Sequence, residues 1–357
     1  MNTERWTRVL EVTYEDKDVQ LLATIDTKYP AIVQKRFTPA VSKGTYIKVN
    51  TTATELALGT GGYDVVKEVL ASRLVAQETK GHIMRLRYTP LQQSVMTVEE
   101  PASPHHALFQ QPFSLNGKKV LLGELHSMVP LACYVAKEMN QSLSCCVIFD
   151  DTASLLLDTS HHVRTLKKET WFHSITIGQS FGGEFEAVSL PSALQFASQS
   201  LQADLIMISV GPGVVGTGTV YGNSAVDMAG WANTVGALDG KPVWIPRLSF
   251  ADRRHRHYGL SHHTVTPLCT LTYAPSILPF PYLDSAQMKL VKSQLSESKL
   301  TKHHVHYSTQ RSDSSLLNRV LLQLEDLTTM GRGYADDPLF FEAILEAACF
   351  CVQGKTS

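Results

Sequence analysis

Short hydrophobic segments alternate with polar and glycine-rich breaks over about the first hundred residues. Residues 8–14, 19–25, 31–37 and 45–50 are rich in β-formers, and glycines stand at the corners between such segments. Several short strands with glycine corners are typical of a small barrel or sandwich. The proline-containing stretch 101–117 has little periodicity, which is typical of a boundary. We therefore expect a β-rich, barrel-like N-terminal domain over residues 1–110.

The rest of the chain alternates apolar runs with helical patterns. Strand-like runs occupy residues 120–125, 144–149, 174–178, 205–210, 243–250 and 305–308. Helical patterns follow at 129–139, 191–201, 224–238 and 314–330, and a last apolar helix starts at Asp336-Asp337-Pro338. This alternation predicts an α/β domain, residues 117–357, with a doubly wound, mostly parallel sheet. The last helix fits burial in the core or a contact between subunits of a homo-oligomer.

The composition narrows the classes of partner. Lysine and arginine total 32 against 33 acidic residues, so no basic footprint for nucleic acid or an anionic membrane is present. No apolar stretch reaches about 18 residues, and the N-terminus lacks the apolar core of a signal peptide. None of the 6 cysteines forms a C-x-x-C pair. We expect a reduced, cytoplasmic protein without disulfides or structural zinc.

A glycine-rich loop follows the apolar run 205–210. Strand, glycine loop and helix together present backbone N–H groups to an anion. The loop matches G-x-G-x-x-G, but Pro212 removes one donor and Asp252 lies about forty residues on, twice the spacing of a dinucleotide site. We expect a small anionic ligand; the alternative is a wide loop that needs glycine only for positive φ. The predicted binding residues are Gly211, Gly213, Gly216, Thr217, Gly218 and Thr219.

A second candidate segment, residues 248–264, combines one acid with three arginines and four histidines. Ligands of open α/β sheets bind at the carboxyl ends of the strands, so Arg253 or Arg254 would clamp the same anion. The histidines are also potential metal ligands. No H-E-x-x-H spacing occurs, and His262 and His263 would point apart on an extended chain, so we expect no metal. The alternative is a solvated basic loop.

Four residues at predicted strand ends are candidates for proton transfer: His126, Asp150, Asp252 and His255. Asp150 also fits a Mg²⁺ ligand or the N-cap of the next segment. His126 fits equally a hydrogen-bonded core histidine. No cofactor is indicated by any motif.

Several strings together resemble one known family: GHIMRLRYTPLQ, SPHH, ELHS, VGPGVVGTGT, PRLSFADRRHRHYGLSHHT and DDPLFFEA. They resemble an uncharacterised bacterial family known as domain of unknown function 3866, over nearly the whole chain. The resemblance implies a cytoplasmic protein of Gram-positive and related bacteria. It implies no activity, catalytic residue or cofactor.

Three functional hypotheses remain at this point. The first is an enzyme acting on a phosphate- or carboxylate-bearing metabolite held by the glycine loop. The second is a non-catalytic sensor that binds a nucleotide or metabolite. The third, nucleic-acid binding by the barrel, depends on Arg85, Arg87 and Tyr88 and is opposed by the neutral net charge.

Overall fold

The computed structural model describes residues 3–56, 62–70, 81–88, 91–151, 156–211, 214–296, 300–311, 313–324 and 327–353. The β-rich N-terminal part forms a closed barrel in the order β1-β2-β3-β5-β4, as the sequence predicts. Its strands are β1 (Glu4–Glu15), β2 (Val19–Thr24), β3 (Ala31–Gln34), β4 (Tyr46–Asn50) and β5 (Asp64–Val69), with the short helix α1 (Thr52–Glu55). Inward side chains such as Val9, Leu22 and Ile47 fill the barrel because strand residues point alternately in and out.

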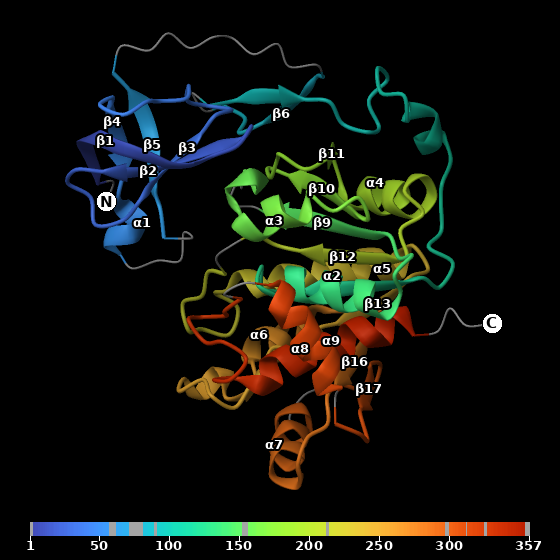
Figure 1. Cartoon of the computed structure of the whole chain (residues 1–357). Coiled ribbons are helices and arrows are strands. Elements are labelled where there is room, and N and C mark those ends of the chain that lie inside the picture. The colour runs from blue at the N-terminus through green and yellow to red at the C-terminus, as the bar shows by residue number, and fades with distance from the viewer. Residues whose placement is uncertain are drawn as a thin grey trace.

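The second part is one eight-stranded parallel sheet in the order β11-β10-β9-β12-β8-β13-β16-β17, which confirms the predicted α/β class. Its strands are β8 (Lys119–Gly123), β9 (Cys145–Asp151), β10 (Phe172–Gly178), β11 (Phe185–Glu186), β12 (Leu205–Ser209), β13 (Lys241–Trp244), β16 (Ile277–Phe280) and β17 (His304–Tyr307). The barrel lies beside the β10–β11 end of this sheet, and α7 lies far from it (Figure 1).

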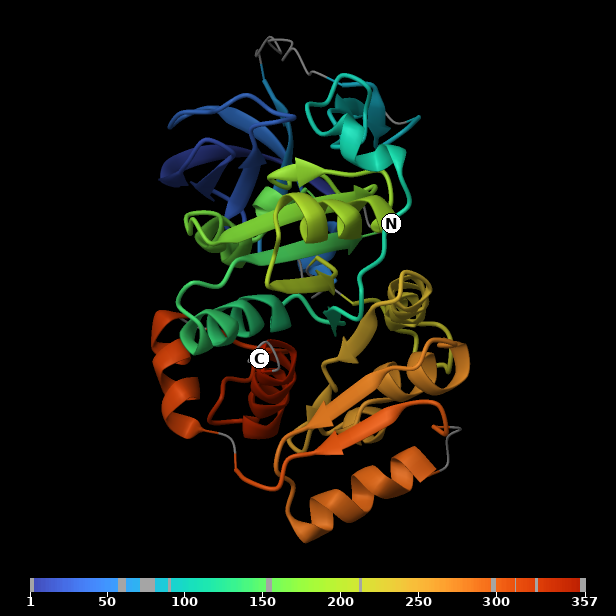
Figure 2. The same ribbon diagram turned by 90° about the vertical axis from the view of Figure 1, so that its right-hand side faces the viewer.

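Helices cover both faces of the sheet because every central strand is apolar on both sides. Leu121, Val147 and Met207 face one core, which α2 (Met128–Met139), α3 (His161–Leu166), α8 (Ser314–Gln323) and α9 (Pro338–Val352) complete. Their chain neighbours Leu122, Ile148 and Ile208 face the other core. That core is completed by α4 (Leu190–Gln195), α5 (Asp227–Ala237), α6 (His262–Thr266) and α7 (Ser285–Ser296). Figure 2 shows the red C-terminal helices on one side of the strands and the yellow and orange helices on the other.

The predicted strand over residues 243–250 is wrong in its extent. Strand β13 ends at Trp244, and Pro246 follows after one residue, where it has no N–H to continue the ladder. Residues Leu248–Ser249 form a separate strand, β14, paired with β15 (Gly259–Leu260). Strand β16 was not predicted because its sequence, ILPF, contains a proline. The early end of β13 decides which side chains reach the carboxyl edge of the sheet.

Residues between the barrel and the large sheet pack onto that sheet. The hairpin β6 (Ile83–Arg85) and β7 (Gln93–Val95) places Arg85 in the interior, where its guanidinium donates to the carbonyls of Gly178 (2.6 Å) and Ala187 (2.8 Å). Leu108, in the short 3₁₀ turn His106–Gln110, packs against the second core. The predicted division into residues 1–110 and 117–357 stays a prediction.

Helix α9 packs into the core, with Phe340, Phe341 and Ile344 buried. Its N-cap, Asp337, makes no capping bond and instead binds Ser249 and Arg332. In the part of the chain that the structure describes, no helix has the length and apolar character needed to cross a bilayer.

Candidate functional site

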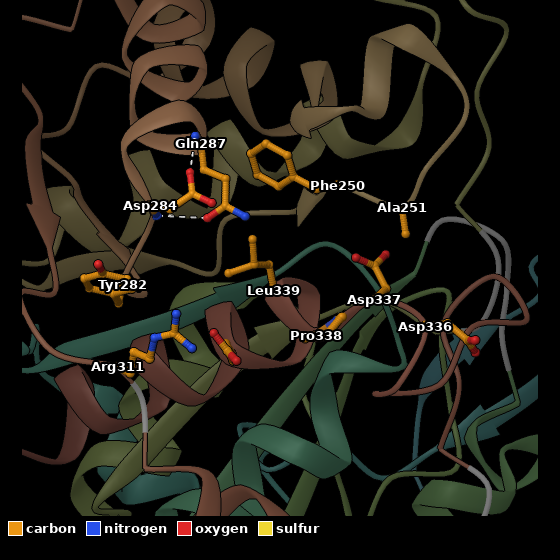
Figure 3. Close-up of a pocket in the computed structure, with 11 residues that line it drawn as sticks. Phe250, Ala251, Tyr282, Asp284, Gln287, Arg311, Asp336, Asp337, Pro338 and Leu339 are labelled. Atoms are coloured by element: carbon orange, nitrogen blue, oxygen red, sulfur yellow. Dashed lines mark hydrogen bonds between the residues drawn. The ribbon is translucent and has the colours of Figure 1, made fainter.

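A cavity of about 340 Å³ lies where β16 and β17 end and α9 begins. Figure 3 shows Arg311 and Tyr282 on one side of this cavity and Asp336 and Asp337 on the other. Burial raises the pKa of a further lining carboxyl, Glu342. The lining has more carboxylates than cationic groups, and none of the residues predicted from the sequence belongs to it. The cavity therefore does not fit the anion site that the sequence predicts.

A buried ion pair lies at the carboxyl ends of β8 and β13, which are neighbours in the sheet. Glu124 directly follows β8, and Arg247 comes three residues after β13. The Nη1 atom of Arg247 donates to Oε1 of Glu124 at 2.9 Å, and both side chains are buried. Burial alone would raise the pKa of Glu124, but the positive charge of Arg247 and a contact with His263 hold it below its ordinary value. The carboxylate is therefore charged inside the protein.

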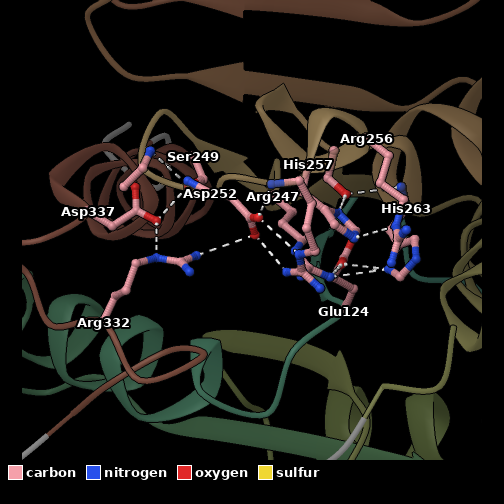
Figure 4. A network of polar contacts seen from close by, with 12 residues as sticks. Glu124, Arg247, Ser249, Asp252, Arg256, His257, His263, Arg332 and Asp337 are labelled. Carbon is pink, nitrogen blue, oxygen red and sulfur yellow. Dashed lines mark hydrogen bonds and ion pairs between the residues drawn. The ribbon is translucent and has the colours of Figure 1, made fainter. Parts of the chain in front are cut away.

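This ion pair fixes an imidazole. The Nδ1 atom of His263 lies 3.2 Å from Nη1 of Arg247 and 3.7 Å from Oε1 of Glu124. Thr264 donates to the second carboxylate oxygen at 3.3 Å. His263 and Thr264 both belong to α6. The N-cap residue of this helix, Ser261, accepts a hydrogen bond from the backbone N–H of His263. Figure 4 shows Glu124, Arg247 and His263 close together in this network.

Two more histidines lie against His263. The ring centroids of His257 and His263 are 4.8 Å apart, and those of His262 and His263 are 4.4 Å apart. Burial lowers the pKa of His257 to about 3 and that of His262 to about 4, so both are neutral at pH 7. The expectation that His262 and His263 point apart required an extended chain. They lie at the start of a helix instead, where successive side chains diverge by about 100° and do not point to opposite sides as on a strand.

The glycine loop reaches the same cluster. A Cβ atom at Gly216 would lie 3.3 Å from Nε2 of His263, and one at Gly218 would lie 3.1 Å from Nη1 of Arg256. Gly218 has φ +79°, a conformation that favours glycine. The two segments predicted to share one sheet edge are therefore in contact.

The loop itself is a compact turn with part of its polar groups already paired. The N–H and hydroxyl of Thr217 both donate to the carbonyl of Gly222, at 2.8 and 3.0 Å, and the hydroxyl of Thr219 accepts from Gly222. Gly211 is buried at the end of β12, and Gly213 lies outside the described residues. This bonding leaves Thr217 and Thr219 with fewer free donors for a ligand than the sequence pattern indicates.

The four predicted proton-transfer residues lie in different surroundings. The Nδ1 atom of His126 lies 3.1 Å from the carbonyl oxygen of Val210, and its Nε2 atom lies 2.6 Å from the hydroxyl of Ser160. Burial lowers the pKa of His126 to about 4. This imidazole thus ties the ends of β8 and β12 to the N-terminus of α3.

Asp150, near the end of β9, accepts a hydrogen bond from the indole of Trp231 at 2.7 Å. Burial raises the pKa of Asp150. Burial and the nearby Asp150 also raise the pKa of Asp227, the first residue of α5. Two carboxylates at this helix N-terminus oppose an anion there, although the strand–loop–helix pattern indicates one.

Asp252 lies buried eight residues beyond β13 and pairs with two guanidiniums. Arg254 lies 2.6 Å from its carboxylate and Arg332 lies 3.5 Å from it. Pairing with Arg254 holds the pKa of Asp252 well below its ordinary value. Arg254 is therefore already neutralised. Arg253 and His255 are exposed, and Arg253 has no hydrogen bond or ion pair with any other described residue.

Residues in the buried cluster were only partly visible in the sequence. Glu124 follows an apolar run, which is a usable signal for a strand-end acid. Arg247 was missed because the strand was extended past it to residue 250. His257, His262 and His263 stood out by composition, but their proximity depends on α6.

Comparison with known proteins gives one family and no curated relative. A search of the curated proteins finds no match. A family model described as protein of unknown function (DUF3866) matches residues 30–348. The match begins just before β3 and ends within α9, so it includes part of the barrel and the whole parallel sheet with the buried cluster. The chain therefore belongs to the DUF3866 family of proteins of unknown function.

Proposed function

We propose that this protein is an enzyme acting on a small metabolite that bears a phosphate or carboxylate group. The observation that carries the proposal is the buried Glu124–Arg247 pair, which fixes His263 at the carboxyl edge of the sheet beside the glycine loop. A charged pair held in the interior costs desolvation energy, and such perturbed groups concentrate at functional sites. The edge of β8, β12 and β13 is also where the strand order reverses, the usual binding position in open α/β sheets.

Charge favours the Arg256 side of this edge for the anionic group. Arg254 is neutralised by Asp252, whereas Arg256 is exposed and lies against Gly218. Because Gly218 has no side chain, the Arg256 guanidinium lies directly against the backbone of the glycine loop. Arg253 adds a second exposed positive charge. A guanidinium binds phosphate or carboxylate through two parallel hydrogen bonds, which orients the ligand as well as holding it.

The neighbouring imidazoles supply the reactive groups. His257 and His262 are neutral at pH 7 because burial lowers the pKa of each, so each has an electron pair on one ring nitrogen. The pair on Nε2 of His257 accepts a hydrogen bond from Nε of Arg256 at 3.2 Å. Glu124 and Arg247 act as positioning residues, because they hold the ring of His263. A ligand bound at Arg256 would lie within reach of this cluster.

A ligand screen tests the proposal. Phosphorylated and carboxylated metabolites are added to the purified protein, and the unfolding temperature is measured. A binding metabolite should raise it, and Arg256→Met should weaken the binding by about 1.5–3 kcal/mol through loss of a charge-assisted bond. Arg253→Met tests the arginine predicted from the sequence, and Arg87→Met, on the distant β6–β7 hairpin, is the matched control.

Hits are then incubated with the protein and followed by mass spectrometry. Consumption of the ligand supports an enzyme. A ligand that stabilises the protein and stays intact supports the alternative, a metabolite sensor. Equal binding by wild-type protein and Arg256→Met, or a preference for uncharged metabolites, would overturn the anion site.

A further inference from the structure

Three imidazoles beside the glycine loop converge on one point. One ligand nitrogen from each of His257, His262 and His263 lies within 4.8 Å of the other two. His257 comes from the turn before β15, and the other two come from α6. We propose that these three histidines bind one divalent transition-metal ion of the zinc class. The inference goes beyond the proposed function and rests on it only for its catalytic meaning, since metal binding is measured without substrate.

In His257 and His263 one ring nitrogen already contacts another side chain, and in His262 one buried ring nitrogen has no hydrogen-bond partner among the described residues. Nδ1 of His257 lies 2.7 Å from the hydroxyl of Ser261, so Nε2 of this ring is available to a metal. His263 binds a metal through Nε2 in the tautomer that carries the proton on Nδ1, which faces the Glu124 carboxylate at 3.7 Å. In that tautomer the Nη1 atom of Arg247 gives up its 3.2 Å contact with Nδ1. Nε2 of His262 is buried and has no hydrogen-bond partner among the described residues. A buried polar atom without a partner is unfavourable, and a bond to a metal would remove this cost.

Outer contacts are of the kind that orient metal-binding histidines. Such residues commonly hold their second nitrogen against a carboxylate, a hydroxyl or a carbonyl, which fixes the ring. Glu124 lies 3.7 Å from Nδ1 of His263, and Ser261 holds Nδ1 of His257.

A metal binds the neutral form of the imidazole ring through the electron pair of one nitrogen. One obstacle is Arg256, whose Nε atom lies 3.2 Å from Nε2 of His257. Its side chain is exposed and can rotate away, and it would then stand beside the ion as a partner for an anion.

Coordination number favours a reactive site over a structural one. In a tetrahedral zinc site, ligand nitrogens lie roughly 3.3 Å apart, so the three rings need only a small inward shift. Within the described part of the chain, the cluster has three members and no fourth His, Cys, Asp or Glu. Three protein ligands leave one position for water or a substrate oxygen, the arrangement of catalytic zinc.

Calorimetric titration with Zn²⁺ tests the site on the full chain after treatment with a chelator. We expect one ion per chain, and Co²⁺ in its place should give the intense visible bands of tetrahedral coordination. His262→Ala and His263→Ala should each weaken binding at least 10-fold, since each removes one of three ligands. His304→Ala, an exposed histidine on β17, is the matched control and should bind as the wild type does.

Circular dichroism and thermal unfolding show whether each variant is folded. Because the Co²⁺ spectrum is taken on the wild type, the proposal can fail even where a variant does not fold. Absence of one-to-one binding to the wild type, an octahedral Co²⁺ spectrum, or equal loss of affinity in His304→Ala would overturn it. Metal binding without turnover of any anionic metabolite would leave the metal site intact and count against the enzyme alone.

Discussion

At the scale of single residues, the main feature of the molecule is a small number of charged side chains buried in its interior. Glu124 and Arg247 are 123 positions apart in the chain and form a 2.9 Å ion pair in the interior. Each partner is tolerable there only because the other is present, since an unpaired buried charge has neither water nor a counter-ion. The pair thus links the ends of β8 and β13, because each buried charge is stable only while the other is present.

This dependence can be measured. Arg247→Met should lower the free energy of unfolding by about 3–5 kcal/mol, because it leaves the Glu124 carboxylate buried and unpaired. The double change Glu124→Gln with Arg247→Met should cost less than the sum of the two single changes, because no uncompensated charge remains. Urea unfolding at neutral pH measures all three variants. Additive costs would show that the two side chains act independently.

His126 predicts a dependence of stability on pH. Its pKa in the folded state is about 4, below the ordinary value of 6.5, so the unfolded chain binds the extra proton first. The contribution of neutral His126 is complete above pH 6.5 and is lost as the pH falls through 4, by about 3 kcal/mol in total. Urea unfolding across this range should show a shallower slope for His126→Asn than for the wild type. Parallel slopes in the two proteins would contradict the assignment.

At the scale of elements, the hydrophobic pattern predicts most strands, but it does not predict which strands lie next to each other in the sheet. Strands β8, β9, β10 and β12 agree with apolar runs, because strands covered on both faces must be apolar throughout. The short elements α3 and α6 were missed, since five or six residues carry too little periodicity to stand out. The pairing of Glu124 with Arg247 requires β8 and β13 to be adjacent, and no local pattern encodes that adjacency. The carboxyl edge of the sheet could therefore be predicted from the sequence, but the cluster of Glu124, Arg247 and His263 on it could not.

The cap of α3 should matter more than an ordinary helix cap. The hydroxyl of Ser160 accepts from the backbone N–H of Val163 and also contacts Nε2 of His126 at 2.6 Å. Ser160→Ala should therefore lose the usual cap energy of about 0.5–2 kcal/mol and, in addition, leave a buried imidazole nitrogen unpaired. Ser189→Ala, which removes the cap of α4, is the matched control. Thermal unfolding compares the two variants. Equal losses of stability in Ser160→Ala and Ser189→Ala would show that the contact with His126 adds nothing to this cap.

At the scale of the whole molecule, the segment that precedes the parallel sheet contacts the edge strand of that sheet, β11. Arg85 lies 3.3 Å from the carboxylate of Glu186 on β11, and Val98 donates to the carbonyl of Glu186. Arg85 and Val98 therefore cover the edge that β11 would otherwise expose. An open edge strand invites pairing with other chains.

Two fragments test this role and the position of the domain boundary together. Residues 81–357 should give a folded protein, because the β11 edge keeps its cover. Residues 117–357 should be less stable and aggregate more, because Glu186 loses Arg85 and the edge is open. Size-exclusion chromatography and thermal unfolding compare them. Equal behaviour would support the predicted boundary at residues 101–117.

The central position of β8 has a consequence for how the chain reaches its native state. β8 is the first strand of the sheet in the sequence, yet it pairs with β12 and β13, more than 80 residues later. Such non-local pairing has a large loop-closure entropy and slows folding. Strands β9 and β10, which are closer in sequence, can pair earlier during synthesis. The Glu124–Arg247–His263 network therefore assembles only after residue 263 has left the ribosome, and any ligand that it binds reports that β8 and β13 have paired.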